Sequence, residues 1–151
     1  MQANLPSDIA NSLAGQEFKS WLLAAVVAGT DVGEFAIGSV GPFAAGGMGI
    51  GGGSLTLQAG AGTFTANDTN FTTFTVNKRT AGGAAVPILL GSTKLTGANA
   101  TGSMAAWSNV KLTAAAGASV APGDVITVAI THGGTGLAVP ASILEIFPSL
   151  N

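Results

Sequence analysis

The sequence has no cysteine and a single histidine, His132, among its 151 residues. Without cysteine, neither a disulfide framework nor a thiolate metal site can form. A nucleophilic site needs a base beside the nucleophile, but His132 stands in a glycine-rich turn and the chain has no GxSxG motif. The seven acidic residues are dispersed and provide no spaced set of metal ligands. We therefore expect no enzyme, no catalytic residues, no metal and no cofactor.

Charge is also scarce, because 8% of residues are charged and the formal net charge is −2. The few cations form no basic stripe that would neutralise phosphates, so we expect no nucleic acid partner. The apolar run at residues 21–28 is far shorter than the roughly 20 residues that span a bilayer. Asp8 and Glu17 precede this run, which is unlike a signal peptide. We expect no membrane partner and no leader of that kind.

Hydrophobic residues are abundant, at 47%, and there are 23 glycines. The length suits one domain with an extension. A surface built from Thr, Ser, Asn, Ala and Gly suits permanent contact better than free solution, because it carries too few charges to stay comfortably in water. The composition therefore predicts an obligate homo-oligomer, with a trimer favoured and a dimer as the alternative.

Residues 1–59 are predicted to form an N-terminal helix followed by a glycine-rich docking arm. Ser7 can cap a helix in which Ile9 and Leu13 share one face. Residues 17–28 fit either a second short helix or a buried strand, and we favour the helix. Ten glycines lie between Gly38 and Gly62.

Glycine at this density predicts that residues 38–53 lack regular structure, because glycine in helices and strands costs backbone entropy. Large apolar residues recur every two to five positions, unlike an ordinary flexible linker, which is the alternative. We expect another chain to order this arm through strand addition. The candidate partner-binding residues are Phe35, Ile37, Val40, Phe43, Met48 and Ile50.

Residues 60–151 are predicted to form an antiparallel β-sandwich or jelly-roll domain. Apolar and polar residues alternate along residues 71–77 and 125–131, which is typical of strands with one buried face. Residues 121–124, with the sequence APGD, predict a type II turn. Further strands are expected at residues 55–57, 86–90, 107–113 and 138–147. The residues expected to be buried are Phe74, Val76, Val110, Leu112, Ile126, Val128, Ile130, Leu144 and Ile146.

Several turns and strands between residues 63 and 147 are similar to those of one known family. They are the segment 67–71 before a Thr-rich strand, the turn at 78–83, Trp107 before residues 110–112, the turn at 121–124, and the segment 136–140 before a hydrophobic strand. In these features the chain resembles the small β-sandwich decoration, or cement, proteins of tailed-bacteriophage heads.

The resemblance implies a structural virion protein that is made in the host cytoplasm. Such a protein binds the outer surface of the capsid, where it bridges neighbouring subunits of the major capsid protein and copies of itself. The alternative is a receptor- or carbohydrate-binding module of a phage fibre or adhesin. That function would favour exposed aromatic residues on the loops, where Trp107 is almost the only candidate, and we interpret Trp107 as a core residue.

Overall fold

A computed structural model describes residues 19–40, 47–57, 65–80, 82–102 and 109–149 of the chain. These residues form nine strands and no helix. The strands are β1 (Lys19–Leu23), β2 (Val32–Ser39), β3 (Met48–Leu57), β4 (Phe71–Arg79), β5 (Val86–Ser92), β6 (Asn109–Ala114), β7 (Ser119–Val120), β8 (Val125–Gly133) and β9 (Ser142–Pro148).

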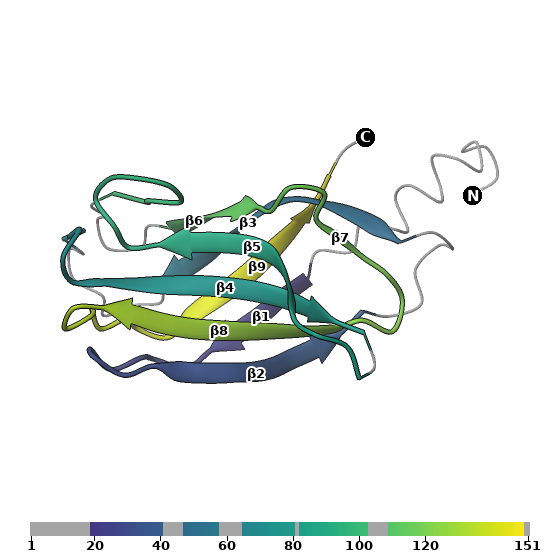
Figure 1. Cartoon of the computed structure of the whole chain (residues 1–151), viewed down its shortest axis with the longest axis horizontal. Coiled ribbons are helices and arrows are strands. Elements are labelled where there is room, and N and C mark those ends of the chain that lie inside the picture. Colours follow the sequence, from purple (N-terminus) through teal and green to yellow (C-terminus); the bar gives the residue numbers. More distant parts are fainter. Residues whose placement is uncertain (1–18, 41–46, 58–64, 81, 103–108, 150–151) are drawn as a thin grey trace, which may run out of the picture.

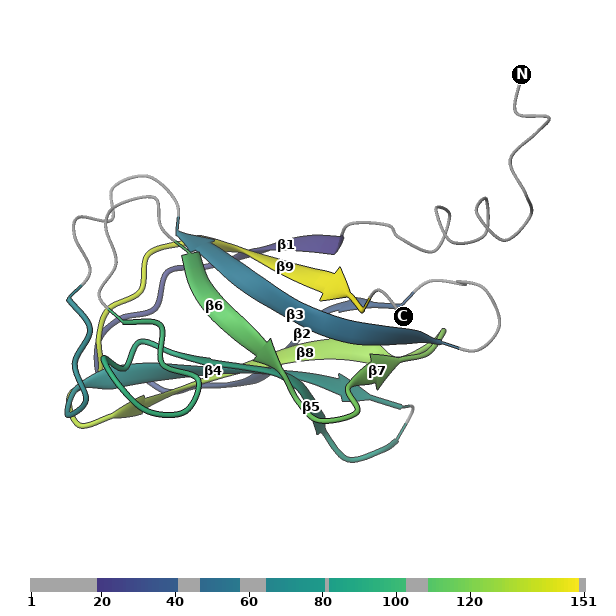
Figure 2. The same ribbon diagram turned by 90° about the horizontal axis from the view of Figure 1, so that it is seen from above.

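The strands form one antiparallel sheet in the order β1-β9-β3-β6-β5-β4-β8-β2, and the short strand β7 pairs with β3. The sheet curls until its two halves face each other, which gives a flattened, nearly closed barrel (Figures 1 and 2). Strands β1 and β2 are consecutive in the sequence but lie at opposite ends of the strand order. The barrel is therefore incomplete between these two strands.

The core is built by strands whose apolar residues alternate with polar ones. In β4, Phe74 and Val76 are buried, and they face Ile130 and Val128 of β8 across the ladder. All nine residues predicted to be buried are indeed buried. The prediction of an antiparallel β-structure after residue 60 is confirmed, because the alternation directs one face of each strand into the barrel.

The turn before β8 has the geometry that its sequence predicts. Gly123 has a φ of 88°, and the Asp124 N–H donates to the carbonyl of Ala121 over 3.1 Å. The Asp124 carboxylate in turn accepts a hydrogen bond of 2.9 Å from the Ala121 N–H. The type II turn is thus closed from both sides, and β8 begins directly after it.

The prediction that residues 38–53 lack regular structure is wrong over the part that the structure describes. Residues 48–57 are strand β3, which pairs with β6, β7 and β9 of the same chain. A Cβ at Gly53 would lie 2.5 Å from the carbonyl oxygen of Glu145. Glycine here permits close approach of two backbones, and the strand partners supply the hydrogen bonds that we expected from another chain.

The predicted helix at residues 17–28 is also wrong for residues 19–28. Residues 19–23 form β1, which pairs with β9 from Lys19↔Ile146 to Leu23↔Ser142. Pairing with β9 satisfies the backbone in this segment and overrides its weak helical pattern. The predicted helix around Ile9 and Leu13 lies outside the described residues, as do Phe43 and Trp107.

Strands from both sides of residue 60 are interleaved in the sheet, since β3 lies between β9 and β6 and β2 lies beside β8.

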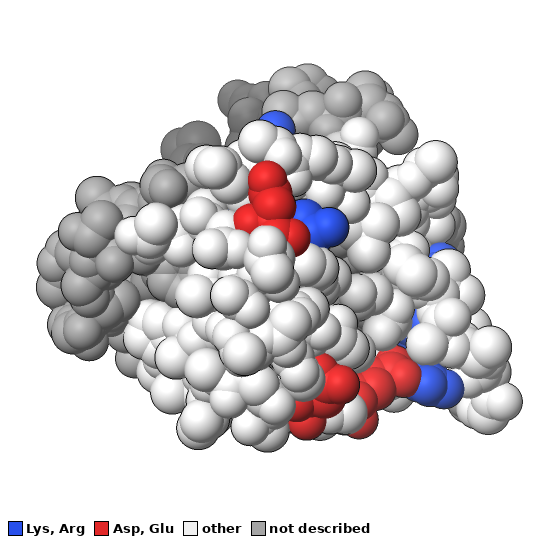
Figure 3. Space-filling view, turned by 60° about the vertical axis from the view of Figure 1, so that its left-hand side comes forward, with Lys and Arg blue, Asp and Glu red and all other residues white. Residues whose placement is uncertain are grey.

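The described part contains no helix long and apolar enough to cross a membrane. Most of the surface in Figure 3 is uncharged, and the acidic and basic side chains gather in a few small clusters.

Candidate functional site

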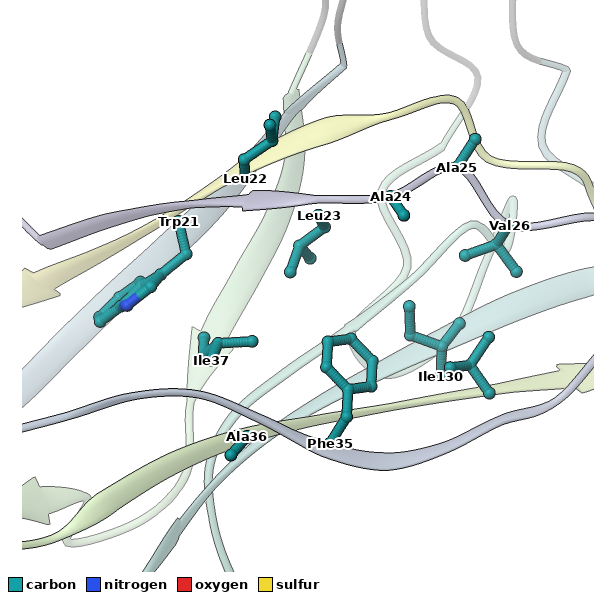
Figure 4. Close-up of a pocket in the computed structure, with 11 residues that line it drawn as sticks. Trp21, Leu22, Leu23, Ala24, Ala25, Val26, Phe35, Ala36, Ile37 and Ile130 are labelled. Atoms are coloured by element: carbon teal, nitrogen blue, oxygen red, sulfur yellow. The ribbon is translucent and has the colours of Figure 1, made fainter.

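The incomplete side of the barrel forms an apolar groove between β1 and β2, which we call the seam (Figure 4). It has a volume of about 710 Å³. One wall is residues 21–26, which comprise the end of β1 and the start of the connection to β2, and the other wall comes from β2 and β8. All the lining residues are uncharged: Trp21, Leu22, Leu23, Ala24, Ala25, Val26, Val32, Phe35, Ala36, Ile37 and Ile130.

Alternation along β1 decides which side chains enter the seam. Trp21 and Leu23 point toward Phe35 and Ile37 on the facing wall, whereas Leu22 points away from them (Figure 4). Leu23 is 2% exposed and Leu22 is 69% exposed. The same strand therefore contributes to the core on one face and places a large apolar side chain in solvent on the other.

Trp21 lies against a glycine of the facing strand. A Cβ on Gly38 would lie 2.7 Å from the indole Nε1 of Trp21, closer than real contacts allow. Glycine at this position lets the indole ring lie against the backbone of β2. The two walls are thus held together here by side-chain packing.

Within the described strands, β1 pairs with β9 and β2 pairs with β8, and no ladder joins β1 to β2. Each of these edge strands consequently presents a row of backbone N–H and C=O groups that its sheet does not use. Such a row is a template for adding another strand. An apolar groove between two open strand edges is suited to binding protein segments and offers no reactive group.

The connection from β1 to β2 closes the other end of the seam. Val26 exchanges two backbone hydrogen bonds with Val139, of 2.7 and 2.9 Å. Asp31, just before β2, accepts a hydrogen bond of 2.9 Å from the His132 N–H, and its Oδ1 lies 2.6 Å from His132 Nδ1. These contacts attach the start of β2 to the end of β8.

Polar side chains on the outer face of the sheet join β2 to its neighbours β8 and β4. The Glu34 carboxylate accepts hydrogen bonds from Arg79 of β4, from the hydroxyl of Thr127 in β8 and from Asn77 of β4. The Arg79 guanidinium, followed by the Thr127 hydroxyl, lowers the pKa of Glu34 to about 2. The hydrogen bonds to the Glu34 carboxylate in turn raise the pKa of Arg79. We call these four residues the Glu34 clamp.

A second acidic group joins two loops away from the seam. Asp68 accepts hydrogen bonds from the backbone N–H groups of Leu95 and Thr96, each of 2.9 Å, and from the Thr96 hydroxyl over 2.7 Å. The bonds from Thr96 lower the pKa of Asp68. The described residues contain no group of three His, Cys, Asp or Glu side chains that could hold a metal ion. Asp68 therefore acts as a tie between loops.

The structure separates the six candidate partner-binding residues. Phe35 and Ile37 line the seam, and Met48 is half-buried at the start of β3. Val40 and Ile50 lie in the core, where they are 8% and 5% exposed. The sixth, Phe43, is outside the described residues.

Strand β1 was not predicted from the sequence as a wall of the site. The signal was present, because a strand with apolar residues on both faces, such as Trp21-Leu22-Leu23, predicts that something covers both faces. The Glu34 clamp was also missed, since its members are 43 to 93 residues from Glu34 in sequence.

Comparisons with models of known protein families, with curated proteins and with solved structures find no match for this chain.

Proposed function

We propose that this chain is a structural virion protein that binds the outer surface of a phage capsid and cements neighbouring major capsid subunits. The observation that carries the proposal is the seam, an apolar groove flanked by two open strand edges. A shell subunit can add an extended segment there and bury the apolar lining at the same time. The role is one of adhesion and involves no catalysis.

The order of strand pairing supports a jelly-roll form of the barrel. With the two-residue strand β7 set aside, β1 pairs with β9, β2 with β8, β3 with β6 and β4 with β5. This nested pairing, first with last and second with second-last, is what the eight strands of a jelly roll have. Jelly rolls occur in viral capsid and lectin domains, among others. Fold alone does not assign function, so the topology adds to the seam and does not replace it.

The surface chemistry is consistent with permanent contact. Leu22, Val27, Val86 and Leu95 are exposed by 69%, 71%, 48% and 52%, and most of the surface in Figure 3 is uncharged. A protein that remained free in solution would be more soluble with more charge on such a surface. We propose that the protein reaches the shell as a homo-oligomer, with a trimer favoured, after synthesis in the host cytoplasm.

No specific observation favours the carbohydrate-binding alternative. Sugar sites commonly use exposed aromatic rings, but in the described part of the chain every aromatic side chain is buried or half-buried. Phe71, for example, lies under the ammonium group of Lys94, which is 4.2 Å from the centre of the ring.

The test is binding to heads that lack this protein. Leu22→Asn changes an exposed side chain on the outer face of β1, where a strand added to the edge of β1 would pack against it, so the barrel should still fold. We expect its occupancy on heads to fall by roughly tenfold or more, as for an interface residue worth about 1.4 kcal/mol. The matched control is Leu95→Asn, because Leu95 is similarly exposed but lies outside the seam lining.

Two results would overturn the proposal. One is equal occupancy for Leu22→Asn and Leu95→Asn, measured by co-sedimentation with heads. The other is absence of the protein from purified particles of its source, measured by mass spectrometry and electron microscopy.

A further inference from the structure

The two open edges of the sheet differ in how regularly they are built, and the edge of β1 is the regular one. β1 pairs with β9 through five successive residue pairs without a register shift. A bridge between Val26 and Val139 continues the antiparallel contact beyond the end of the strand. A strand without interruptions presents its free N–H and C=O groups at regular spacing. The open edge of β1 is therefore a good template for another strand.

The edge of β2 is interrupted. Its pairing with β8 contains two register shifts, one between Val32 and Phe35 and one between Ala36 and Gly38, and in both places the extra residue lies on β2. Bulges of this kind bend a strand and increase its twist, and they are a common way of protecting an edge from pairing. Glu34 adds a charged side chain within the first bulge. β2 is therefore a poor template, although it is the longer of the two strands.

The lining of the seam defines the side chains that a strand added to β1 would carry. Trp21 and Leu23 point into the seam and Leu22 points away from it (Figure 4). Side chains of an added strand would alternate in the same way, so that every second one enters the volume of about 710 Å³. The lining residues are all uncharged, and an ionised side chain buried there would lose its hydration without gaining a partner. The seam therefore selects an extended segment whose inward residues are apolar.

A second copy offers no such segment in the part of the chain that the structure describes. The inward side chains of its β1 are already in use, because Leu23 is buried in its own core and Trp21 lies against Gly38 of its own β2. The edge of its β2 carries the two bulges. Of the other strands, β7 has two residues, and the rest have a partner on both sides. The segment must therefore come from a different protein.

We propose that the seam binds one extended, uncharged segment of a shell subunit, which adds to the edge of β1 and leaves the edge of β2 unpaired. Apolar residues on one face of this segment enter the seam against Trp21, Leu23 and Phe35, and its other face lies beside Leu22. The source of the segment in a shell subunit rests on the proposed function, whereas the choice of edge and the chemistry of the segment do not.

The first test uses the full chain and a synthetic probe. The probe alternates valine and threonine over roughly eight residues, the length of the edge from residue 19 to residue 26, and has a lysine at each end for solubility. At millimolar probe, hydrogen exchange of the amides of residues 21–23 should slow severalfold, and exchange of the β2 amides should not change. Slower exchange in β2 alone, or in neither strand, would overturn the proposal.

A charged version of the probe tests the chemistry of the segment. It has lysine in place of the central valine and is otherwise identical. We expect it to bind at least about tenfold more weakly, because its ammonium group would enter the uncharged seam. Equal affinity of the two probes, measured by titration calorimetry, would contradict the selection of apolar inward residues.

A pair of matched variants tests the choice of edge independently. Leu22 on β1 and Ala36 on β2 are both exposed, and each alternates with side chains that point into the seam. Leu22→Lys should weaken the neutral probe by roughly tenfold, because a lysine on an edge opposes strand addition, and Ala36→Lys should have little effect. Thermal unfolding checks that both variants fold, and hydrogen exchange of the unmodified chain decides the matter if one does not. Equal weakening by the two variants would overturn the choice of β1.

Three outcomes distinguish this proposal from the proposed function. If the probe protects β1 and competes with heads for the protein, both hold. If the probe protects β1 but the protein does not bind heads, the choice of edge stands and the proposed function fails. If heads bind the protein but protect the β2 amides, the proposed function stands and this proposal fails. Protection of β1 that grows with protein concentration in the absence of the probe would show that a second copy is the occupant, which also overturns the proposal.

Discussion

Strands β8 and β2 lie side by side in the sheet but are held by different forces. β8 pairs with β4 on one side and β2 on the other, and Ile126, Val128 and Ile130 are buried. β2 pairs with β8 alone, and its side chains are half-buried or exposed. A central strand is stabilised mainly by burial, whereas this edge strand combines the partial burial of Phe35 and Ile37 with the solvent-accessible Glu34 clamp.

The largest effect should come from removing a side chain of the buried region. Phe74 in β4 is 1% exposed, and Phe74→Ala should lower the free energy of unfolding by about 3–5 kcal/mol, because it leaves a cavity in a close-packed core. Phe35→Ala in β2 should cost roughly 1–2 kcal/mol, since its half-buried ring removes less area from water. Urea unfolding measures both, and equal losses would contradict the contrast between core and edge.

An intermediate effect is expected where two backbones meet. Gly53→Ala in β3 should destabilise the protein by roughly 1–3 kcal/mol, because its Cβ would lie 2.5 Å from the Glu145 carbonyl oxygen and 2.7 Å from Leu89 Cδ1. The matched control is Gly33→Ala in β2, where no atom lies within 4 Å of an added Cβ. Thermal unfolding should show a clear loss for the first variant and little change for the second. Tolerance of Gly53→Ala would show that the sheet relaxes there.

The smallest effect, and the one that depends on pH, concerns the Glu34 clamp. The pKa of Glu34 is about 2 in the folded protein and 4.5 for an ordinary Glu, so ionised Glu34 stabilises the fold. This contribution is fully present above about pH 4.5 and is lost as the pH falls toward 2. The wild type should therefore unfold at higher urea than Glu34→Gln at pH 7, and the difference should vanish near pH 2.

Asp68→Asn is the control that distinguishes loss of the Glu34 clamp from loss of any acidic side chain with a lowered pKa. Asp68 also has a lowered pKa but ties loops that do not include β2. Hydrogen exchange of the β2 amides should become faster in Glu34→Gln and stay unchanged in Asp68→Asn. Faster exchange in both variants would mean that β2 responds to global stability and not to its clamp.

The strands that were predicted correctly are those in which apolar and polar residues alternate along the sequence. In β4 and β8, strict alternation of apolar and polar residues predicted the strands and their buried faces. In β3 the residues Gly51-Gly52-Gly53 suggested a segment without regular structure, because sequence shows the entropic cost of glycine but not the strand partners that offset it. In β1 a weak helical pattern was overridden by pairing with β9.

The candidate site was predicted only in part, for the same reason. Phe35 and Ile37 were identified as partner-binding residues and do lie in the seam, but Val40 and Ile50 are part of the core. The facing wall at Trp21 could not be assigned from sequence, because it becomes a wall only when β1 pairs with β9 at the far end of the strand order.

The antiparallel β-structure after residue 60, its buried faces and the turn at residues 121–124 follow from local sequence patterns. Side-chain periodicity and the backbone freedom of glycine are local properties, and a local pattern records them. Long-range strand pairing makes β3 a strand, brings Glu34 to Arg79 and Thr127, and leaves an apolar seam open between β1 and β2. Each of these depends on which distant segments the sheet brings together, and the free energy of that pairing belongs to no single stretch of the chain.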